Sequence, residues 1–323
     1  MPKQTMIRAA AVQLEAEVGD IDANLTMCEA LINDAAVEGA SWIALPEFFS
    51  TGVANLPELA ENAPSTDGAP TQLLRAMAQR HNAYIGGSTL VRDHDGHVRN
   101  AYFLAGPSGR ILGRHNKDIP TMWENRLYIG GDDPGRLKAD DLTVGVALCW
   151  ELMRTQTAIR LAGQVDLVMS GSGWWSIPMW HPKRLFQTLQ KANERRAIEA
   201  AGTFAPFVGV PVIHGAHCGT VSCPWPLSFL IYQGHFQGGA MICDHRGRLI
   251  AARYRSDGPG VVVADVILER ADPQPTPRGY WLQQRGSVAA VCWEYQNRLG
   301  RWQYRGARPP KRSLETSNVS PSL

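Results

Sequence analysis

The sequence predicts an α/β fold in which helices cover sheets that are buried on both faces. Short apolar runs alternate with stretches of helical periodicity along most of the 323 residues. The runs are almost continuously apolar, which is typical of strands covered on both sides. Apolar residues make up 44% of the chain and charged residues 19%, a composition that supports a large folded core. No repeat of fixed short period interrupts this pattern.

The first half of the chain predicts five strands and two helices. Asp20 is a good N-cap for the first helix, and Gly39 is a good stop for it. The turn at 106–109 joins the last two strands into a hairpin. The predicted strands are 7–13, 41–46, 83–88, 100–105 and 110–114, and the predicted helices are 21–36 and 71–81.

The second half continues the alternation of strands and helices. Its most apolar strand has the sequence LTVGVAL at 142–148, and a helix is expected to follow it and run through Ile159. A second, longer helix is expected at 182–201. The remaining predicted strands are 165–169, 204–210, 241–243, 249–254 and 261–266.

The composition changes near residue 272, which divides the chain into a body and an extension. Residues 1–272 form the predicted domain, and residues 273–323 form a C-terminal extension that begins with closely spaced prolines. Within the extension, 279–305 is expected to dock as an arm on the body or on a partner subunit. The Ser-rich last 15 or so residues are expected to be disordered.

Charge and cysteine content narrow the function classes. The formal charge is +2, and the segment 301–323 alone carries +4, so the other residues sum to −2. A slightly acidic body gives no reason to expect a nucleic-acid partner. Six cysteines in so long a chain do not indicate a disulfide framework. With no apolar window of membrane-spanning length and no signal-peptide pattern, we expect a cytoplasmic protein without a membrane partner.

Motifs for nucleotide or metal chemistry are missing from the sequence. It contains neither GxxxxGK[ST], nor GxGxxG after a strand, nor HExxH, so we expect no cofactor. A group of histidines and cysteines between 214 and 235 has none of the usual zinc spacings, and we expect a polar loop near a site entrance, with a buried cysteine or two, and no metal site. The group consists of His214, His217, Cys218, Cys223 and His235.

Three polar residues each follow a different apolar strand. Cys149 follows 142–148 at a point where a helix can begin, and Glu47 and Lys117 follow two other predicted strands. Because α/β sheets place ligands at the carboxyl ends of strands, a nucleophile, a base and a cation can meet there. Each residue alone has an ordinary explanation, as a buried thiol, a loop acid or a surface charge. Together they indicate acyl-transfer chemistry.

At these residues the sequence resembles the nitrilase superfamily of carbon–nitrogen hydrolases. The family's Glu–Lys–Cys triad is similar to ALPE at 44–47, NK at 116–117 and ALCWE at 147–151, in matching order and spacing. The likeness extends to RRAIE at 195–199 and FQGGA at 236–240. It covers about residues 5 to 270. Ala200 stands where the family usually has asparagine, so that segment departs from the pattern.

The resemblance implies a four-layer α-β-β-α sandwich and assigns roles to the site residues. Cys149 would be the nucleophile, Glu47 the general base and Lys117 the stabiliser of the tetrahedral intermediate, with the Trp150 backbone N–H as a further donor. Glu124 is similar to the family's second glutamate, which helps to position the substrate. The resemblance also implies that no metal or organic cofactor is required, and that the protein forms a homodimer or a larger homo-oligomer.

The expected activity is hydrolysis of a non-peptide C–N bond in a small amide, nitrile or N-carbamoyl compound. Trp150, Trp174 and Trp175 lie within or just after the catalytic stretch and would position an apolar or aromatic substrate group. They could equally be core residues under a long loop or part of a dimer interface. Two alternatives stay open, an acyltransferase that passes the acyl group to an amine and a non-catalytic binding protein on the same scaffold. Candidates for a substrate carboxylate are Arg154, His181 and Lys183.

Overall fold

The computed structural model describes residues 5–226, 229–277 and 286–306. The strands are β1 (Met6–Leu14), β2 (Trp42–Ala44), β3 (Tyr84–Arg92), β4 (Val98–Ala105), β5 (Ile111–Asn116), β6 (Arg136–Ala139), β7 (Leu142–Leu148), β8 (Leu167–Ser172), β9 (Val212–His217), β10 (Thr220–Pro224), β11 (Ile231–His235), β12 (Gly238–Cys243), β13 (Leu249–Tyr254) and β14 (Gly260–Ile267). The helices are α1 (Ile21–Val37), α2 (Glu58–Glu61), α3 (Ala69–His81), α4 (Thr155–Leu161), α5 (Lys183–Val208) and α6 (Gly286–Gly306), with 3-10 turns η1 (Met122–Arg126), η2 (Cys149–Met153) and η3 (Arg255–Asp257).

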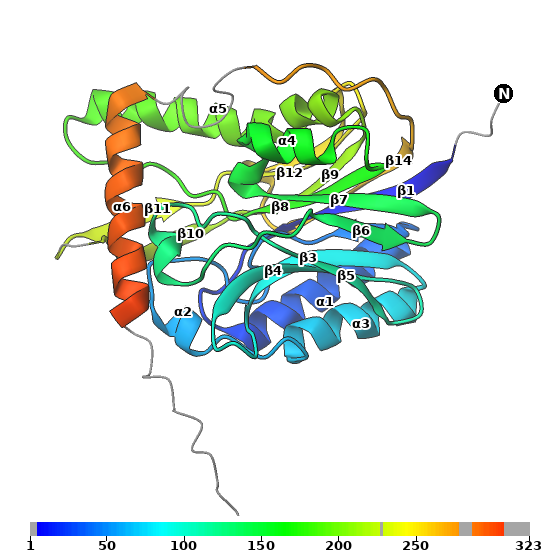
Figure 1. Cartoon of the computed structure of the whole chain (residues 1–323), viewed down its shortest axis with the longest axis horizontal. Coiled ribbons are helices and arrows are strands. Elements are labelled where there is room, and N and C mark those ends of the chain that lie inside the picture. Colours follow the sequence, from blue (N-terminus) through cyan, green and yellow to red (C-terminus); the bar gives the residue numbers. More distant parts are fainter. Residues whose placement is uncertain (1–4, 227–228, 278–285, 307–323) are drawn as a thin grey trace, which may run out of the picture.

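Two sheets pack face to face between two layers of helices (Figure 1). One sheet has the order β5-β4-β3-β2-β1-β14, and the other has the order β6-β7-β8-β9-β12-β13. They join where the end of β1 pairs with the end of β9, through Gln13 with Ala216 and Leu14 with His217. Helices α1 and α3 cover the first sheet, and α4 and α5 cover the second. The four-layer α-β-β-α sandwich is therefore confirmed.

The apolar core lies in three layers that follow from the sequence pattern. Between the sheets it is built from side chains of both, such as Ala9, Val146 and Ile213. The α1 helix begins where Asp20 accepts a hydrogen bond from the Ala23 N–H at 3.0 Å, as the capping pattern predicts. The hairpin of β4 and β5 also lies where the sequence placed it.

The predicted strand at 204–210 is wrong, because α5 continues through it. Buried Ala197, Ala201, Phe204 and Val208 recur three or four residues apart, so the apolar run is one stripe of a helix facing the second sheet. Gly209, with φ at +81°, ends the helix in the left-handed conformation. The next strand is β9.

The histidines and cysteines at 214–235 also differ from the prediction of a polar loop. His214 and His217 lie in β9, and Cys223 and His235 lie in the paired strands β10 and β11. Both histidines of β9 are buried, and burial lowers the pKa of each to about 4, so they are neutral. These residues therefore belong to the framework of the fold.

The segment after β2 lies very close to β8 and β9 of the other sheet. A Cβ atom at Gly171 would lie 2.5 Å from the Glu47 nitrogen, and one at Gly215 would lie 2.6 Å from the Leu45 carbonyl carbon. Only residues without a side chain leave room for this backbone. The two glycines therefore set the depth at which Glu47 enters the sandwich.

Helix α6 lies within the C-terminal extension and crosses one end of the sandwich (Figure 1). It packs along η1, where the Asn125 Nδ2 donates to Asn297 Oδ1 at 2.8 Å. Further along α6, the Tyr304 hydroxyl accepts from the Val98 N–H at 3.1 Å. Helix α6 is thus packed on the body of its own chain. The boundary after residue 272 stays a prediction, and the Ser-rich end falls outside the described residues.

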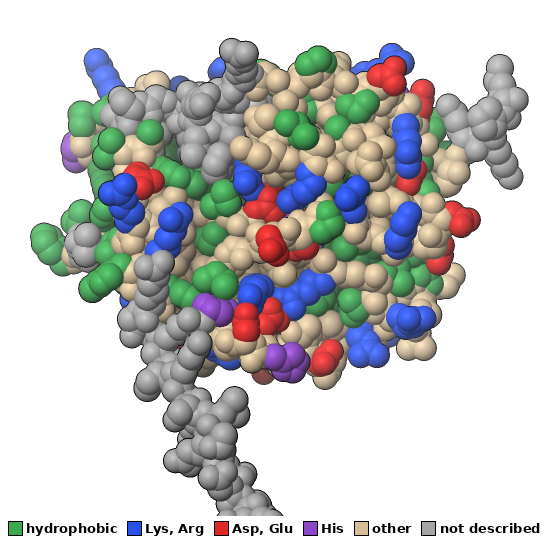
Figure 2. All heavy atoms as spheres, viewed as in Figure 1, with side chains coloured by type: hydrophobic (Ala, Val, Ile, Leu, Met, Phe, Trp, Pro, Cys, Tyr) green, Lys and Arg blue, Asp and Glu red, His purple; other side chains and the backbone are tan. Residues whose placement is uncertain are grey.

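Acidic and basic side chains alternate over the face of the molecule drawn in Figure 2, without one continuous field of either sign among the coloured residues. None of the helices in the described part of the chain is both long and apolar enough to cross a membrane. All six cysteines are free thiols, and Cys292 is less buried than the other five.

Candidate active site

The three predicted residues meet at one end of the inter-sheet layer. Glu47 follows β2, Lys117 directly follows β5, and Cys149 directly follows β7 as the first residue of η2. The Lys117 Nζ lies 2.8 Å from Glu47 Oε1, and both side chains are fully buried. The Cys149 side chain also contacts Glu47, so the fold brings together residues that lie far apart in the sequence.

Glu47 is held by four separate contacts. Its Oε1 accepts from Asn100 Nδ2 at 2.8 Å as well as from Lys117, and its Oε2 accepts from the Gly173 N–H at 3.1 Å. Its backbone carbonyl accepts from His217 Nε2 at 2.6 Å. Burial raises the pKa of Glu47 to about 7, although Lys117 opposes that shift. A carboxylate with this pKa can both take up and release a proton near neutral pH.

Lys117 lies between two buried carboxylates. Its Nζ is 2.8 Å from Glu124 Oε2 and 3.3 Å from the Thr121 hydroxyl. Burial by itself would lower the pKa of Lys117, but the two glutamates outweigh it and hold the pKa well above its ordinary value. Lys117 is therefore a permanent cation in this site.

Glu124 is fixed through one of its two oxygens. Oε2 accepts from Lys117, from the Thr121 N–H at 2.9 Å and from the Tyr128 hydroxyl. Oε1 is buried and has no hydrogen-bond partner within the described residues. An unpaired carboxylate oxygen in such a place is costly unless a ligand supplies a donor.

Cys149 has φ at +51°, in the left-handed region that non-glycine residues rarely adopt. Phe48, next to Glu47, and Met122, two residues before Glu124, share this conformation. Such residues gather at functional sites, where the surrounding structure holds them in place. All three segments of the site thus carry a constrained backbone position.

The Cys149 thiol is protonated in the resting site. Burial raises its pKa well above the ordinary value, the Glu47 carboxylate raises it further, and Lys117 only partly offsets these effects. A nearby lysine and a helix start would by themselves favour the thiolate. In the structure burial prevails, so the thiol must lose its proton to a base as it reacts.

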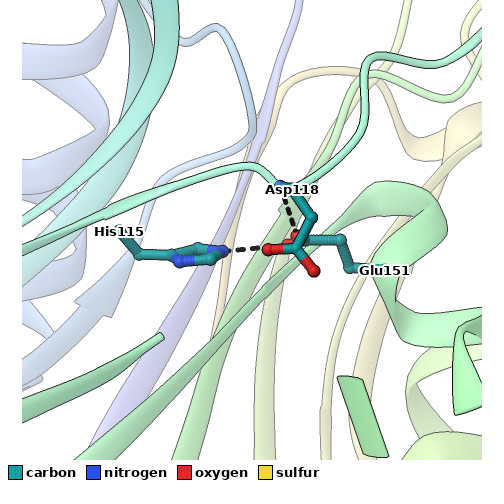
Figure 3. A group of neighbouring side chains, drawn as sticks. All are labelled: His115, Asp118 and Glu151. Atoms are coloured by element: carbon teal, nitrogen blue, oxygen red, sulfur yellow. Dashed lines mark hydrogen bonds and ion pairs between the residues drawn. The ribbon is translucent and has the colours of Figure 1, made fainter. Parts of the chain in front are cut away.

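A second buried network joins the backbones next to Cys149 and Lys117 (Figure 3). The carboxylate of Glu151 accepts from the Leu148 N–H and from the Asp118 N–H, both at 2.8 Å. It also contacts His115 Nε2 at 3.1 Å. Glu151 therefore ties the residue before Cys149 to the residue after Lys117.

His115, Asp118 and Glu151 offer ligand atoms within 4.8 Å of one another, as a metal site would. Each of these atoms already takes part in a hydrogen bond or ion pair. Asp118 forms ion pairs with Arg154 and Arg160. The carboxylates of Glu151 and Asp133 raise the pKa of His115 to about 9, although burial opposes this shift. A protonated imidazole cannot ligate a metal, so the cluster is an ion-pair network. Arg154, one of the candidates for a substrate carboxylate, is thus paired with Asp118 in the structure.

A cavity of about 320 Å³ opens from Cys149 towards α5 and α6. Trp150, Trp174 and Trp175 line it, as the sequence analysis expected for substrate-positioning residues. Their role in binding stays a prediction. Its walls are mostly aromatic and aliphatic. The remaining lining residues are Thr121, Met122, Ser176, Ile177, Pro178, Trp180, Leu185, Phe186, Leu189, Ala192, Asn193, Arg196, Trp225, Cys292 and Gln296.

Several residues around the site were not found from the sequence. Asn100 holds Glu47 from a strand where nothing in spacing or composition marks it, and His217, noted only within the group at 214–235, holds the Glu47 backbone. Cys292 and Gln296 reach the cavity from α6. The predicted docking arm indicated that this segment packs on the body, but it did not indicate which residues face the site. His181 and Lys183, the other carboxylate candidates, are exposed and do not line the cavity.

Curated proteins resemble part of the chain. The omega-amidase NIT2 of Mus musculus is 29% identical over 162 residues, which make up 47% of this chain and 57% of that protein. A nitrilase of Pyrococcus abyssi is 29% identical over 165 residues, which make up 49% of this chain and 61% of that protein. The chain thus spans less than two thirds of the length of these relatives.

Solved structures share the fold over nearly the whole chain. A carbon-nitrogen hydrolase from Helicobacter pylori G27 matches with a TM-score of 0.67 at 16% identity, covering 94% of this chain and 96% of that one. A variant of the amidase from Nesterenkonia sp. AN1 matches with a TM-score of 0.62 at 17% identity, covering 89% and 99%. At these identities the likeness shows the fold alone.

The sequence pattern of the carbon-nitrogen hydrolase family matches residues 8–276. This match includes all three strand ends that meet in the buried site, and the sandwich has the architecture of that family's solved members. The chain therefore belongs to the carbon–nitrogen hydrolase family.

Proposed function

We propose that this protein hydrolyses the C–N bond of a small amide through a thioester on Cys149. The observation that carries the proposal is that Cys149, which lines a substrate-sized cavity, lies against the buried pair of Glu47 and Lys117. The family supports a hydrolase, and two relatives are named omega-amidase and nitrilase. In the Nesterenkonia amidase, acrylamide has added to the active-site cysteine.

In the first step Glu47 takes the proton of the Cys149 thiol as sulfur bonds to the amide carbon. The carbonyl oxygen then becomes an oxyanion that needs a donor. Lys117 has three N–H donors, and the bond to Thr121, at 3.3 Å, is longer than its two contacts to carboxylates. We expect this third donor to turn from Thr121 to the oxyanion. The Trp150 backbone N–H is the second donor that the sequence suggested.

Collapse of the intermediate breaks the C–N bond and leaves a thioester. The proton held by Glu47 moves to the leaving nitrogen, so ammonia or an amine departs neutral. The free Oε1 of Glu124 can accept a hydrogen bond from that nitrogen before it leaves. Water then attacks the thioester, Glu47 receives its proton, and release of the carboxylic acid returns that proton to sulfur. None of these steps calls for a metal or organic cofactor.

A nitrile or an N-carbamoyl compound can follow the same route. With a nitrile the first adduct is a thioimidate, which water converts to a tetrahedral intermediate and then to the thioester. The cavity of about 320 Å³ is at the small end of ligand pockets, which favours a low-molecular-weight substrate. Its walls carry no acidic side chain among the described residues, and aromatic rings predominate.

The test is release of ammonia from an amide, a nitrile and an N-carbamoyl compound that share one phenyl side chain. We expect release from at least one of them, and none with Cys149→Ala, whose fold is checked by circular dichroism. Glu47→Gln and Lys117→Met should each lose most of the activity. A Cys149→Ala protein that still releases ammonia would refute the assignment of the nucleophile.

A further inference from the structure

Helix α6 forms one wall of the substrate cavity. Cys292 and Gln296, one turn apart on this helix, both line the cavity that opens at Cys149. Between them Trp293 stacks on Trp150, the residue after the nucleophile, with ring centroids 5.0 Å apart and planes inclined by 13°. The C-terminal extension therefore contributes directly to the surface that a substrate would meet.

The position of α6 is fixed by close contacts with the body. Gly300 lies so near η1 that a Cβ there would be 2.9 Å from the Arg126 nitrogen, which leaves no room for a side chain. The Asn297 carboxamide accepts from Asn125 at 2.8 Å, and the Tyr304 hydroxyl contacts His97 Nδ1 at 3.0 Å. A helix held at several points along its length can place a side chain in the cavity reproducibly.

Gln296 is a buried residue whose side-chain nitrogen has no partner among the described residues. The residue is only 2% exposed, and Nε2 itself is buried. Asn193, which lines the same cavity, is satisfied, since it accepts from Trp174 Nε1 at 2.9 Å and donates to the Trp175 carbonyl at 3.0 Å. Buried amides are normally paired, so an unpaired donor facing a cavity indicates a place for a ligand acceptor.

The rest of the cavity wall defines the group that carries this acceptor. Six aromatic side chains line it, and they suit the flat faces of an aromatic ring. Arg196 is the one charged side chain among the described lining residues, and it is half-buried on α5. The six aromatic residues are Trp150, Trp174, Trp175, Trp180, Phe186 and Trp225.

We propose that Gln296 is a specificity-determining residue that donates a hydrogen bond to an acceptor oxygen on a compact, neutral aromatic acyl group. The inference rests on the proposed function, because it names the class of amide that the site takes. Suitable substrates are aryl-substituted amides with an ether, hydroxyl or carbonyl oxygen on the ring. An analogue without that oxygen leaves the Gln296 amide unpaired in the complex and binds less well for that reason.

The experiment compares the three positional isomers of methoxyphenylacetamide with the matching ethylphenylacetamides, which have nearly the same shape without the acceptor. We expect kcat/KM for at least one methoxy isomer to exceed that of its ethyl partner by on the order of tenfold. Gln296→Leu should bring this ratio to about one. Gln303→Leu, on the same helix but not in the cavity lining, should leave the ratio unchanged.

Binding to Cys149→Ala, followed by tryptophan fluorescence, separates this inference from the proposed chemistry. Ammonia release with a ratio near one for every isomer would keep the hydrolase and overturn the role of Gln296. A binding preference that disappears in Cys149→Ala/Gln296→Leu, with no ammonia from any compound, would keep the subsite and overturn the hydrolase. A preference for the methoxy compound that remains in Gln296→Leu would also contradict the proposal. So would a stronger preference for carboxyphenylacetamide that Arg196→Gln removes.

Discussion

Replacing Gly171 by alanine is expected to displace Glu47, the proposed base, without changing its side chain. The added Cβ would lie 2.5 Å from the Glu47 nitrogen and 2.7 Å from the Pro46 carbonyl carbon. These are backbone atoms, so they must move by roughly 1 Å to restore an ordinary contact. The Glu47 carboxylate would then lose the geometry of its 2.8 Å contacts with Lys117 and Asn100.

Two effects of different size follow from this displacement. Overpacking a buried site of this kind lowers the free energy of unfolding by about 1–3 kcal/mol. A misplacement of about 1 Å in a catalytic group can lower the rate by about 100-fold. Because the cavity wall is built from other residues, kcat is expected to fall much more than KM changes.

The assay combines urea denaturation with steady-state ammonia release. Gly145→Ala is the matched control, since its Cβ would meet only the side-chain ends of Leu161 and Val165, at 3.2 to 3.3 Å. It should retain most of the wild-type kcat. If Gly171→Ala kept both its urea midpoint and its kcat, or if Gly145→Ala were equally impaired, the explanation by backbone contact would be wrong.

Three further predictions concern the charges of the site. Since burial raises the pKa of Glu47 to about 7 and only the carboxylate can accept the thiol proton, kcat/KM should rise as pH increases through about 7; a profile flat between about pH 6 and 8 would contradict this. Lys117→Met leaves Glu47 and Glu124 buried without a cation, so the free energy of unfolding should fall by about 3–5 kcal/mol near pH 8. The loss should be smaller near pH 5, where Glu47 is protonated, and urea denaturation at both pH values tests this. Glu151→Gln places an N–H₂ group opposite a backbone N–H donor, so kcat should fall by roughly tenfold while KM changes little. An unaltered kcat would show that the hydrogen bonds of Glu151 do not position the site.

The sequence determines much of the fold because its signals are local. The cap at Asp20 and the apolar strand before Cys149 predict elements that the structure contains. The strand predicted at 204–210 failed because Phe204 and Val208, which are spaced for a helix face, also belong to a short apolar run. Such a run cannot be assigned from periodicity alone, and here packing of α5 on the second sheet decides it.

The site was only partly predictable, for a physical reason. Glu47, Lys117 and Cys149 follow strands, so the sheet rule places them at one edge, and the structure brings them together. Asn100 and Gln296 reach the site through tertiary packing, which leaves no mark in their own neighbourhoods. The protonated thiol likewise depends on burial by distant segments.

Some predictions stay untested by this structure. The homodimer or larger assembly, the cytoplasmic location and the domain boundary after residue 272 remain expectations. Within the single chain, α6 docks on its own body, as the contact of Asn297 with Asn125 shows. Light scattering of the purified protein would determine its assembly.

The central claim is that Cys149 carries the acyl group during turnover. The most direct measurement is the intact mass of the protein after acid quench during turnover of phenylacetamide, followed by peptide mapping. The account predicts an increase equal to the acyl group minus one hydrogen, located on the peptide that contains Cys149 and absent in Cys149→Ser. An acyl group found on another residue, or steady turnover by Cys149→Ser, would contradict it.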